Sequence, residues 1–302
     1  MPVLTVQDLR KSFGKNEVVK GVSFQVNEGA TFGFLGKNGA GKSTTINILT
    51  GVMYATSGSF TMLGKPHTQL DEIKREIGVM PDAANFYTDM TALAHLRFFA
   101  QIKGIKSNTE QLRKLLNEVG LTDHEGKKVA KFSFGMKKKL GIAQALVGSP
   151  KLIFLDEPTS GVDAESILNI HEIILRLRKK GITVLMTSHN MSEVEKLCTD
   201  IAIMQQGVIA ASGTLSELQA EYESSVNVIL EVPAFPVELL GILKFDLGET
   251  CIQVSYHEGL LDCEMTDKSQ IPDIHYWLAD RRIDTYQVRL KQATLEEIFI
   301  SI

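Results

Sequence analysis

The stretch Gly36 to Thr44, GKNGAGKST, decides the fold of this sequence. It stands between a short apolar run, Thr31 to Leu35, and a second apolar segment, Thr45 to Thr50. The first run predicts a buried strand and the second a buried helix, so the segment between them is a strand-to-helix turn. Glycines allow positive φ, and the first turn of a helix presents unpaired N–H groups and the positive end of its dipole. Such a turn attracts phosphate.

The turn matches the spacing G-x-x-x-x-G-K-[ST] of a phosphate-binding loop, in the strand and helix context that the motif requires. We expect Lys42 to reach the β and γ phosphates of a nucleotide, and the Ser43 hydroxyl to ligate Mg²⁺. The alternative is a glycine-rich turn that binds no ligand. The predicted nucleotide-binding residues are Gly36, Lys37, Asn38, Gly39, Ala40, Gly41, Lys42, Ser43 and Thr44.

The composition is ordinary for a globular protein, with 302 residues, 44% hydrophobic and 23% charged. No run of about 18 uncharged apolar residues appears, and the N-terminus lacks the apolar region of a signal peptide. We therefore expect a cytoplasmic chain that does not cross the membrane itself. Cys198, Cys251 and Cys263 have no metal-binding spacing and form an odd set, which suits a reducing compartment and small buried hydrophobes.

The net charge of −4 is unevenly distributed. Residues 221–302 contain 15 Asp and Glu against 6 Lys and Arg, so this part of the chain is strongly acidic and the rest is basic. The acidic part is a poor candidate for binding nucleic acid or anionic lipid, and we expect no nucleic-acid partner.

Apolar strand-like runs alternate with helical patterns through about residue 220, which favours an α/β domain with a largely parallel sheet. The runs are KLIFLD at 151–156, ITVLMTS at 182–188 and IAIMQQGVIAASG at 201–213. Helical patterns replace the strands between about residues 82 and 148, which indicates a helical insertion. The sequence therefore predicts a first domain over residues 1–220.

A second, small α+β domain is predicted over residues 221–302. VNVILEV, CIQVSY and TYQVRL alternate apolar and polar residues, and IPDIHYWLADRR reads as a helix. The final segment, ATLEEIFISI, predicts another helix, in which Thr294 and Glu297 form a capping box and Leu295, Ile298 and Phe299 share one face.

A second segment with candidate functional residues is LIFLDEPTSGVD, residues 152–163. Its apolar strand brings Asp156 and Glu157 to the carboxyl end of a sheet, where open α/β sheets bind ligands. Asp156 fits a Mg²⁺ carboxylate, and Glu157 fits a residue that polarises the attacking water. The alternative is a strand that ends in a solvated acidic turn.

Two further segments complete the set. His189 ends another apolar strand, TSH at 187–189; it is either a structural histidine or, if the strand lies beside the one carrying Asp156, a group within reach of the γ-phosphate. In KFSFGMKKKLGIAQAL, residues 131–146, Ser133 is a predicted N-cap and Gly135 allows close approach, so the helix that follows offers a second phosphate-binding end.

The order and spacing of these segments resemble the ATP-binding subunit of an ABC transporter, across residues 1 to about 220. The resemblance implies a P-loop NTPase core with a β subdomain, ATP and Mg²⁺ as ligands, and ATP hydrolysis. It identifies GKNGAGKST as Walker A, LIFLDE as Walker B with catalytic Glu157, SGVD as the D-loop with Asp163, and His189 as the H-loop histidine. Phe13 falls where the family stacks an aromatic ring on adenine; plain core is the alternative.

The resemblance also implies partners. Members of the family pair head to tail, as homodimers or heterodimers, so that each ATP lies between Walker A of one subunit and the signature of the other. The signature here is Ser133, Phe134, Gly135 and Met136. The tail resembles the accessory domain of the exporters with an ABC-2 type permease, which implies a subunit held on the inner face of the membrane by that permease.

Two departures from the family pattern bear on turnover. Asp82 stands where the family has a glutamine that touches Mg²⁺ or the attacking water, and Phe132, Phe134 and Met136 replace the usual Leu, Gly and Gln of the signature. Asp82 is therefore a candidate catalytic and Mg²⁺ residue, with a solvated loop residue as the alternative. We expect an ATPase that powers export; the rivals are a weakly hydrolysing nucleotide sensor and a soluble ABC regulatory protein.

Overall fold

The computed structural model describes residues 1–82, 86–222 and 225–302. They form two compact units, Met1–Leu215 with Ile302, and Ser216–Ser301. The border expected at residue 220 falls inside α8 (Leu215–Tyr222). Residues 83–85, at the start of the expected helical insertion, and residues 223–224, in the expected C-terminal domain, lie outside the described residues.

An antiparallel sheet opens the first unit. Its strands follow the order β2-β1-β4-β5. They are β1 (Pro2–Phe13), β2 (Asn16–Asn27), β4 (Ser57–Met62) and β5 (Lys65–Pro66). Apolar residues such as Leu4, Val6 and Phe60 point to the buried face, because alternate side chains of a strand lie on one side of the sheet.

The second sheet of this unit positions the chemistry. Its order is β10-β9-β3-β8-β7-β6, and neighbours from β9 to β6 run parallel. The strands are β3 (Thr31–Leu35), β6 (Ile77–Met80), β7 (Leu152–Asp156), β8 (Thr183–Ser188), β9 (Asp200–Gln205) and β10 (Val208–Gly213). The predicted strand at Thr31–Leu35 and the predicted α/β fold are confirmed. Since β3, β8 and β7 are parallel neighbours, the segments that follow them emerge at one edge.

One run predicted as a strand is a hairpin. Residues 201–213 divide into β9 and antiparallel β10, with a turn at Gln206 and Gly207, whose φ angles are 47° and 92°. The Gln-Gly pair supplies the left-handed turn that the apolar pattern alone does not reveal.

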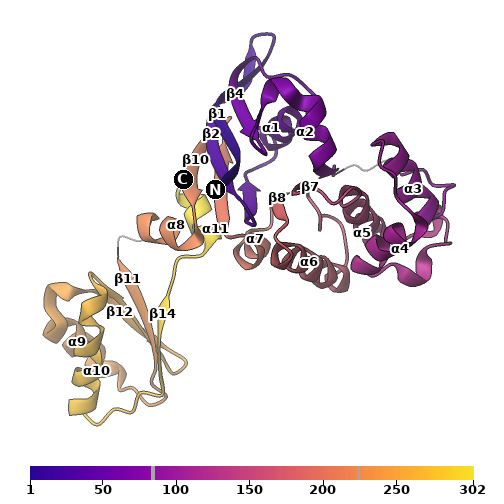
Figure 1. Ribbon diagram of the computed structural model, residues 1–302. Coiled ribbons are helices and arrows are strands. Elements are labelled where there is room, and N and C mark those ends of the chain that lie inside the picture. The colour runs from indigo at the N-terminus through magenta and orange to yellow at the C-terminus, as the bar shows by residue number, and fades with distance from the viewer. Residues whose placement is uncertain (83–85, 223–224) are drawn as a thin grey trace. The chain divides into compact units, whose positions relative to one another are not determined.

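The helices of the first unit are α1 (Lys42–Leu49), α2 (Leu70–Glu76), α3 (Ala92–Ile102), α4 (Thr109–Glu118), α5 (Phe134–Ala145), α6 (Ala164–Lys179) and α7 (Met191–Leu197). They lie on the parallel sheet, except that two of them, α3 and α4, pack on α5 rather than on the sheet (Figure 1). One apolar core joins α3 to α6 with β7 and β8, and a second joins the antiparallel sheet with β3 and α1. The helix predicted from Thr45 begins three residues earlier, at Lys42, because the phosphate loop supplies its first turn.

The contact between β6 and α5 is unusually close. A Cβ atom built on Gly78 would lie 2.0 Å from the carbonyl oxygen of Ala145, the last residue of α5. The helix end therefore rests directly on the strand backbone, and only glycine fits at this position.

The C-terminal unit is a small α+β fold. Its antiparallel sheet has the order β12-β13-β11-β14. The elements after α8 are β11 (Val226–Glu231), α9 (Leu240–Leu247), β12 (Cys251–His257), β13 (Leu260–Met265), α10 (Ile271–Asp280), β14 (Gln287–Lys291) and α11 (Leu295–Ser301). Trp277 packs in its core and donates to Asp246 at 2.8 Å. The predicted capping box is confirmed, since Thr294 N donates to Glu297 (2.8 Å) and Glu297 N to Thr294 Oγ1 (3.2 Å).

The three thiols are covered by the fold. Cys251 and Cys263 are buried, and Cys198 is half-buried. Burial raises the pKa of Cys263 to about 12 and also raises the pKa of Cys198 and of Cys251. Within the described residues, no helix combines the length and the apolar character needed to cross a bilayer.

Candidate active site

The phosphate loop connects β3 to α1. Gly41 precedes α1 with φ 107°, a left-handed conformation that favours glycine, and a Cβ there would meet the carbonyl oxygen of Val18 at 2.9 Å. The loop encloses a cavity of about 150 Å³, lined by Val18 and residues 38–44. A larger hollow of about 590 Å³ is lined by residues of α2 and of the antiparallel sheet, away from this loop. The backbone-lined cavity at a helix start is the geometry that suits a phosphate group.

Lys42 lies inside the loop that it follows. Its amine donates to the carbonyl oxygens of Gly36 (2.5 Å) and Lys37 (3.3 Å). Burial lowers the pKa of Lys42, and the nearby charges of Glu157 and Asp156 oppose that change. The Lys42 amine therefore lies close enough to Asp156 and Glu157 to feel their charges, at the edge of the sheet where the parallel strands end.

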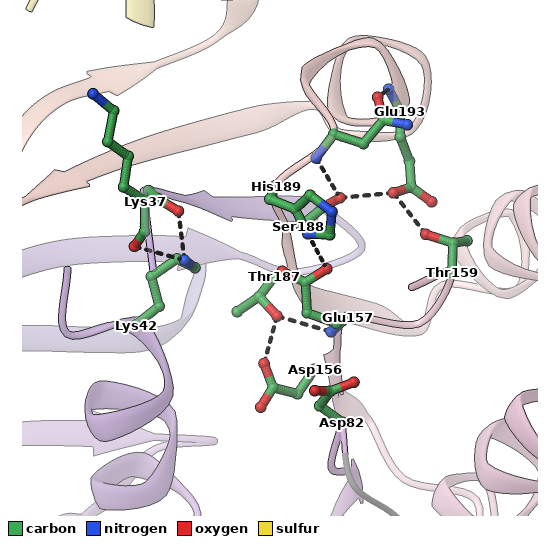
Figure 2. A network of polar contacts seen from close by, with 12 residues as sticks. Lys37, Lys42, Asp82, Asp156, Glu157, Thr159, Thr187, Ser188, His189 and Glu193 are labelled. Atoms are coloured by element: carbon green, nitrogen blue, oxygen red, sulfur yellow. Dashed lines mark hydrogen bonds and ion pairs between the residues drawn. The ribbon is translucent and has the colours of Figure 1, made fainter. Parts of the chain in front are cut away.

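Thr187 fixes the two carboxylate residues. As predicted, the strand that ends in TSH lies beside the one that carries Asp156: β8 pairs with β7, and Thr187 lies opposite Asp156. The Thr187 hydroxyl donates to Asp156 Oδ1 (2.5 Å) and accepts from the Glu157 N–H (2.9 Å). Figure 2 shows both bonds. One hydroxyl thus orients the candidate metal carboxylate and the candidate base together.

Glu157 and His189 form a pair. Glu157 Oε2 lies 2.8 Å from His189 Nδ1; the Glu157 side chain is 15% exposed and the His189 side chain 63%. Glu157 also has a φ of 48°, a left-handed conformation that is strained for a residue with a Cβ. Strained backbone of this kind persists where the surroundings hold it, and such positions cluster at active sites.

A buried carboxylate on α7 connects the segments around this pair. Glu193 is 2% exposed. Its Oε2 accepts from Ser188 (2.7 Å) and Thr159 (2.9 Å), and its Oε1 lies 2.9 Å from His171 Nε2. Ser188 precedes His189, and Thr159 lies between Glu157 and Asp163. Glu193 therefore holds the segment of Glu157 and the segment of His189 against each other (Figure 2).

The signature segment begins α5. Ser133 is the N-cap, as predicted, and its Oγ accepts from Met136 N at 3.2 Å. Phe134 is 52% exposed, and its ring lies against Gly161. Gly135 permits a close approach of α6, because a Cβ there would lie 2.3 Å from Ser166 Oγ. The free face of this helix start is thus formed by Ser133 and Phe134.

Asp163 is the N-cap of α6. Its carboxylate accepts from Ser166 N and from the Ser166 hydroxyl, both at 2.9 Å. These hydrogen bonds lower the pKa of Asp163. Asp163 therefore shapes the turn between Glu157 and α6 through Ser166.

Asp82 has a partner that the sequence did not reveal. Its carboxylate lies 3.1 Å from the amine of Lys138, whose side chain is 5% exposed against 55% for Asp82. The same amine donates to the carbonyl oxygen of Glu157 at 2.7 Å. Asp82 is therefore joined to the acidic strand through a lysine of α5, while its own side chain remains more than half exposed, as the solvated-loop alternative expects.

Phe13 ends β1 and is 51% exposed, with the Lys11 amine 5.1 Å from its ring centre. The plain-core alternative for Phe13 is therefore wrong, and its ring is accessible to a planar ligand.

The residues present fit a magnesium ion held together with substrate phosphates. Mg²⁺ prefers oxygen ligands and usually takes one or two from the protein. Ser43 offers an exposed hydroxyl at the start of α1, and Asp156 offers a carboxylate oriented by Thr187. In the part of the chain that the structure describes, no group of three or more His, Cys, Asp or Glu is placed to hold a metal.

Sequence reasoning missed Thr187, Glu193 and Lys138 as parts of the site. Thr187 is a polar residue at the end of a buried strand, which is a readable signal. Lys138 stands in a run of three lysines, and only the helical period to buried Gly141 and Ile142, three and four residues later, indicates that this one faces inward.

Comparison with known proteins agrees with this geometry. The model of the ABC transporter family matches residues 19–160. The linearmycin resistance ATP-binding protein LnrL of Bacillus subtilis (strain 168) is 32% identical, over 99% of this chain and 98% of its own. The lantibiotic transport ATP-binding protein SrtF of Streptococcus pyogenes is 37% identical, over 75% of this chain and 94% of its own. Among solved structures, the ADP conformation of MJ1267, an ATP-binding cassette of an ABC transporter, matches with a TM-score of 0.66 and 28% identity, over 72% of this chain and 92% of that one.

Proposed function

The chain belongs to the ABC transporter ATP-binding proteins and is an ATPase, and from that premise we propose that it powers export through separate membrane-spanning subunits. The observation that carries the proposal is the meeting of Lys42, Asp156 and the Glu157–His189 pair at one edge of the parallel sheet. The family membership then supplies the link between hydrolysis and transport.

In the proposed reaction, Glu157 accepts the proton of the attacking water or polarises it. His189 holds one oxygen of that carboxylate, so that the other faces the water. Lys42 binds the β and γ phosphates, for which its amine leaves the carbonyl oxygens of the loop. Ser43 and Asp156 would hold Mg²⁺, which neutralises phosphate charge when bound. Phe13 stacks on the adenine ring.

The proposal includes a pair of ATP-binding subunits, identical or not. The α5 start, with Ser133 and exposed Phe134, would face the γ-phosphate bound to the other subunit, because helix N-terminal N–H groups bind phosphate. ATP binding closes such a pair, and hydrolysis reopens it.

For the transport step we propose export of an antibiotic, because the names of two relatives concern lantibiotic transport and linearmycin resistance. The membrane partner would be an ABC-2 type permease, which would hold this chain at the inner, cytoplasmic face of the cell membrane. The C-terminal unit, residues 221–302 in the expected division, would serve pairing or permease contact rather than chemistry.

A second candidate function is a nucleotide sensor that binds ATP and turns it over slowly. The observations that favour it are the Asp82 carboxylate held by Lys138 and the Phe134 ring at the signature. Steady-state turnover of the purified chain, alone and with its permease, separates the two candidates.

The proposed chemistry is tested with two substitutions. Lys42→Ala should strongly weaken ATP binding. Glu157→Gln should bind ATP normally and turn over about a hundredfold to ten-thousandfold more slowly, which is the usual contribution of a general base. Near-parental turnover of Glu157→Gln would remove Glu157 from its assigned role.

A further inference from the structure

Lys138 of α5 is a buried amine with a full set of partners. Its side chain is 5% exposed. It donates to the carbonyl oxygen of Glu157 at 2.7 Å, to Asp82 Oδ1 at 3.1 Å and to the Asp82 carbonyl oxygen at 3.4 Å. An ammonium group has three N–H donors, and a buried ammonium requires paired acceptors, so these oxygens account for the whole group.

One of those acceptors belongs to the strained residue of the site. Glu157 adopts a φ of 48°, and each of its polar groups is held by a different side chain. Thr187 accepts from its N–H, His189 pairs with its carboxylate, and Lys138 donates to its carbonyl oxygen. Only the last of these contacts comes from α5, the helix that begins at the signature.

We propose that Lys138 is a positioning residue for ATP hydrolysis, which holds the Glu157 peptide in the left-handed conformation that aims the carboxylate. Asp82 supplies the side-chain and carbonyl oxygens that fix the Lys138 amine in place. The position of α5, and with it of Ser133, thereby sets the aim of Glu157. This inference rests on the proposed function, because it takes Glu157 as the catalytic base.

The test compares substitutions along α5 in the purified full chain with MgATP. Lys138→Met keeps the length and apolar stem of the side chain and removes the donor. We expect its kcat to fall about tenfold to a hundredfold, the usual effect of a small misplacement of a catalytic group, while the KM for ATP changes less than about twofold. Lys139→Met, one residue further along, is the matched control and should keep parental kcat, because within the described residues Lys139 has no side-chain hydrogen bond or ion pair.

A second variant covers the case in which Lys138→Met does not fold. Lys138→Gln retains an N–H donor without the charge, and we expect a kcat between that of the parent and that of Lys138→Met. Lys138→Arg, which keeps the charge and the donors, should recover most of the activity. Parental kcat in folded Lys138→Met or Lys138→Gln would overturn the proposal, as would an equal loss in Lys139→Met.

Hydrogen exchange gives a readout independent of turnover. The Glu157 N–H donates to Thr187 Oγ1. Exchange in the peptide covering residues 156–163 should accelerate in Lys138→Met and stay parental in Lys139→Met. Unchanged exchange in Lys138→Met would refute the positioning role. If exchange accelerates but Glu157→Gln retains turnover, the contact stands and the assignment of Glu157 as base fails, so the two failures are distinguishable.

Discussion

Gly78→Ala tests how rigidly α5 is seated on β6. The added Cβ would lie 2.0 Å from the carbonyl oxygen and 2.7 Å from the carbonyl carbon of Ala145. Both are backbone atoms at the end of α5, so no side-chain rotation can relieve the contact, and the helix or the strand must shift. Overpacking of a core costs roughly 1–3 kcal/mol, and we expect a value of about 2–3 kcal/mol in this case.

Substitutions at two other glycines serve as controls for the expected loss of stability. A Cβ on Gly33 would meet Val194 Cγ1 at 2.7 Å and Cys198 Sγ at 2.8 Å, which are side-chain atoms that can move. A Cβ on Gly126 would meet nothing within 4 Å. We expect Gly33→Ala to lose less stability than Gly78→Ala. We expect Gly126→Ala to have the stability of the parent or to be more stable by about 0.4–1 kcal/mol.

The measurement is thermal unfolding of the full chain followed by circular dichroism. For a unit of this size, each kcal/mol lowers Tm by about 2–4 °C, so Gly78→Ala should melt roughly 4–12 °C below the parent. Trp277 is the only tryptophan and lies in the C-terminal unit, so its fluorescence supplies an internal reference. If Gly78→Ala and Gly126→Ala melt together, the contact yields easily and α5 is not rigidly seated.

Three further predictions concern the site. Ser133→Arg in a Glu157→Gln background should keep ATP affinity but lose ATP-dependent pairing in size-exclusion chromatography, since the side chain would block the opposite phosphate; a normal dimer would contradict the trans contact. Asp82→Gln removes the carboxylate expected near the triphosphate and keeps an oxygen for Lys138, so ATP hydrolysis should be equal or faster and should require less Mg²⁺. Hydrolysis rates of the parent and the variant, measured against free Mg²⁺, test this, and overlapping curves would remove Asp82 from the site. Glu193→Gln keeps an acceptor oxygen for Ser188 and Thr159 and removes the charge that faces His171, whereas Glu193→Ala leaves these donors without an acceptor. Urea unfolding should show that the free energy of unfolding falls by about 1–3 kcal/mol in the Ala variant and by less in the Gln variant. Equal losses in the two variants would show that the hydrogen bonds do not contribute to stability.

The sequence predicted the parts of the site that have a local spacing. The phosphate loop, the buried strand before it and the N-cap at Ser133 follow from residues that stand next to one another, because glycine, lysine and small hydroxyl residues have strong conformational or chemical preferences. The pairing of β7 with β8 was predicted because each is an apolar strand that ends at a candidate functional residue.

What the sequence did not predict depends on contacts between distant segments. Lys138 and Asp82 are 56 residues apart in the sequence, and the run of three lysines does not indicate which of them is buried. Strand β13 and helix α9 were not predicted, because their apolar patterns are short and are interrupted by charged residues. The strain at Glu157 has no sequence signature, since the chain places a glutamate where local preference favours glycine.

The burial of the thiols makes the chain suitable for site-directed spectroscopy. Maleimide dyes and spin labels react with thiolates. The raised pKa of Cys263, about 12, and the raised pKa of Cys251 and of half-buried Cys198 keep the native thiols protonated near pH 7. A cysteine placed at an exposed position, such as Leu168 on α6, would react selectively without removing the others. Two copies that carry this single label would report their separation directly, so the opening and closing of a pair could be timed in a chain that is otherwise unaltered.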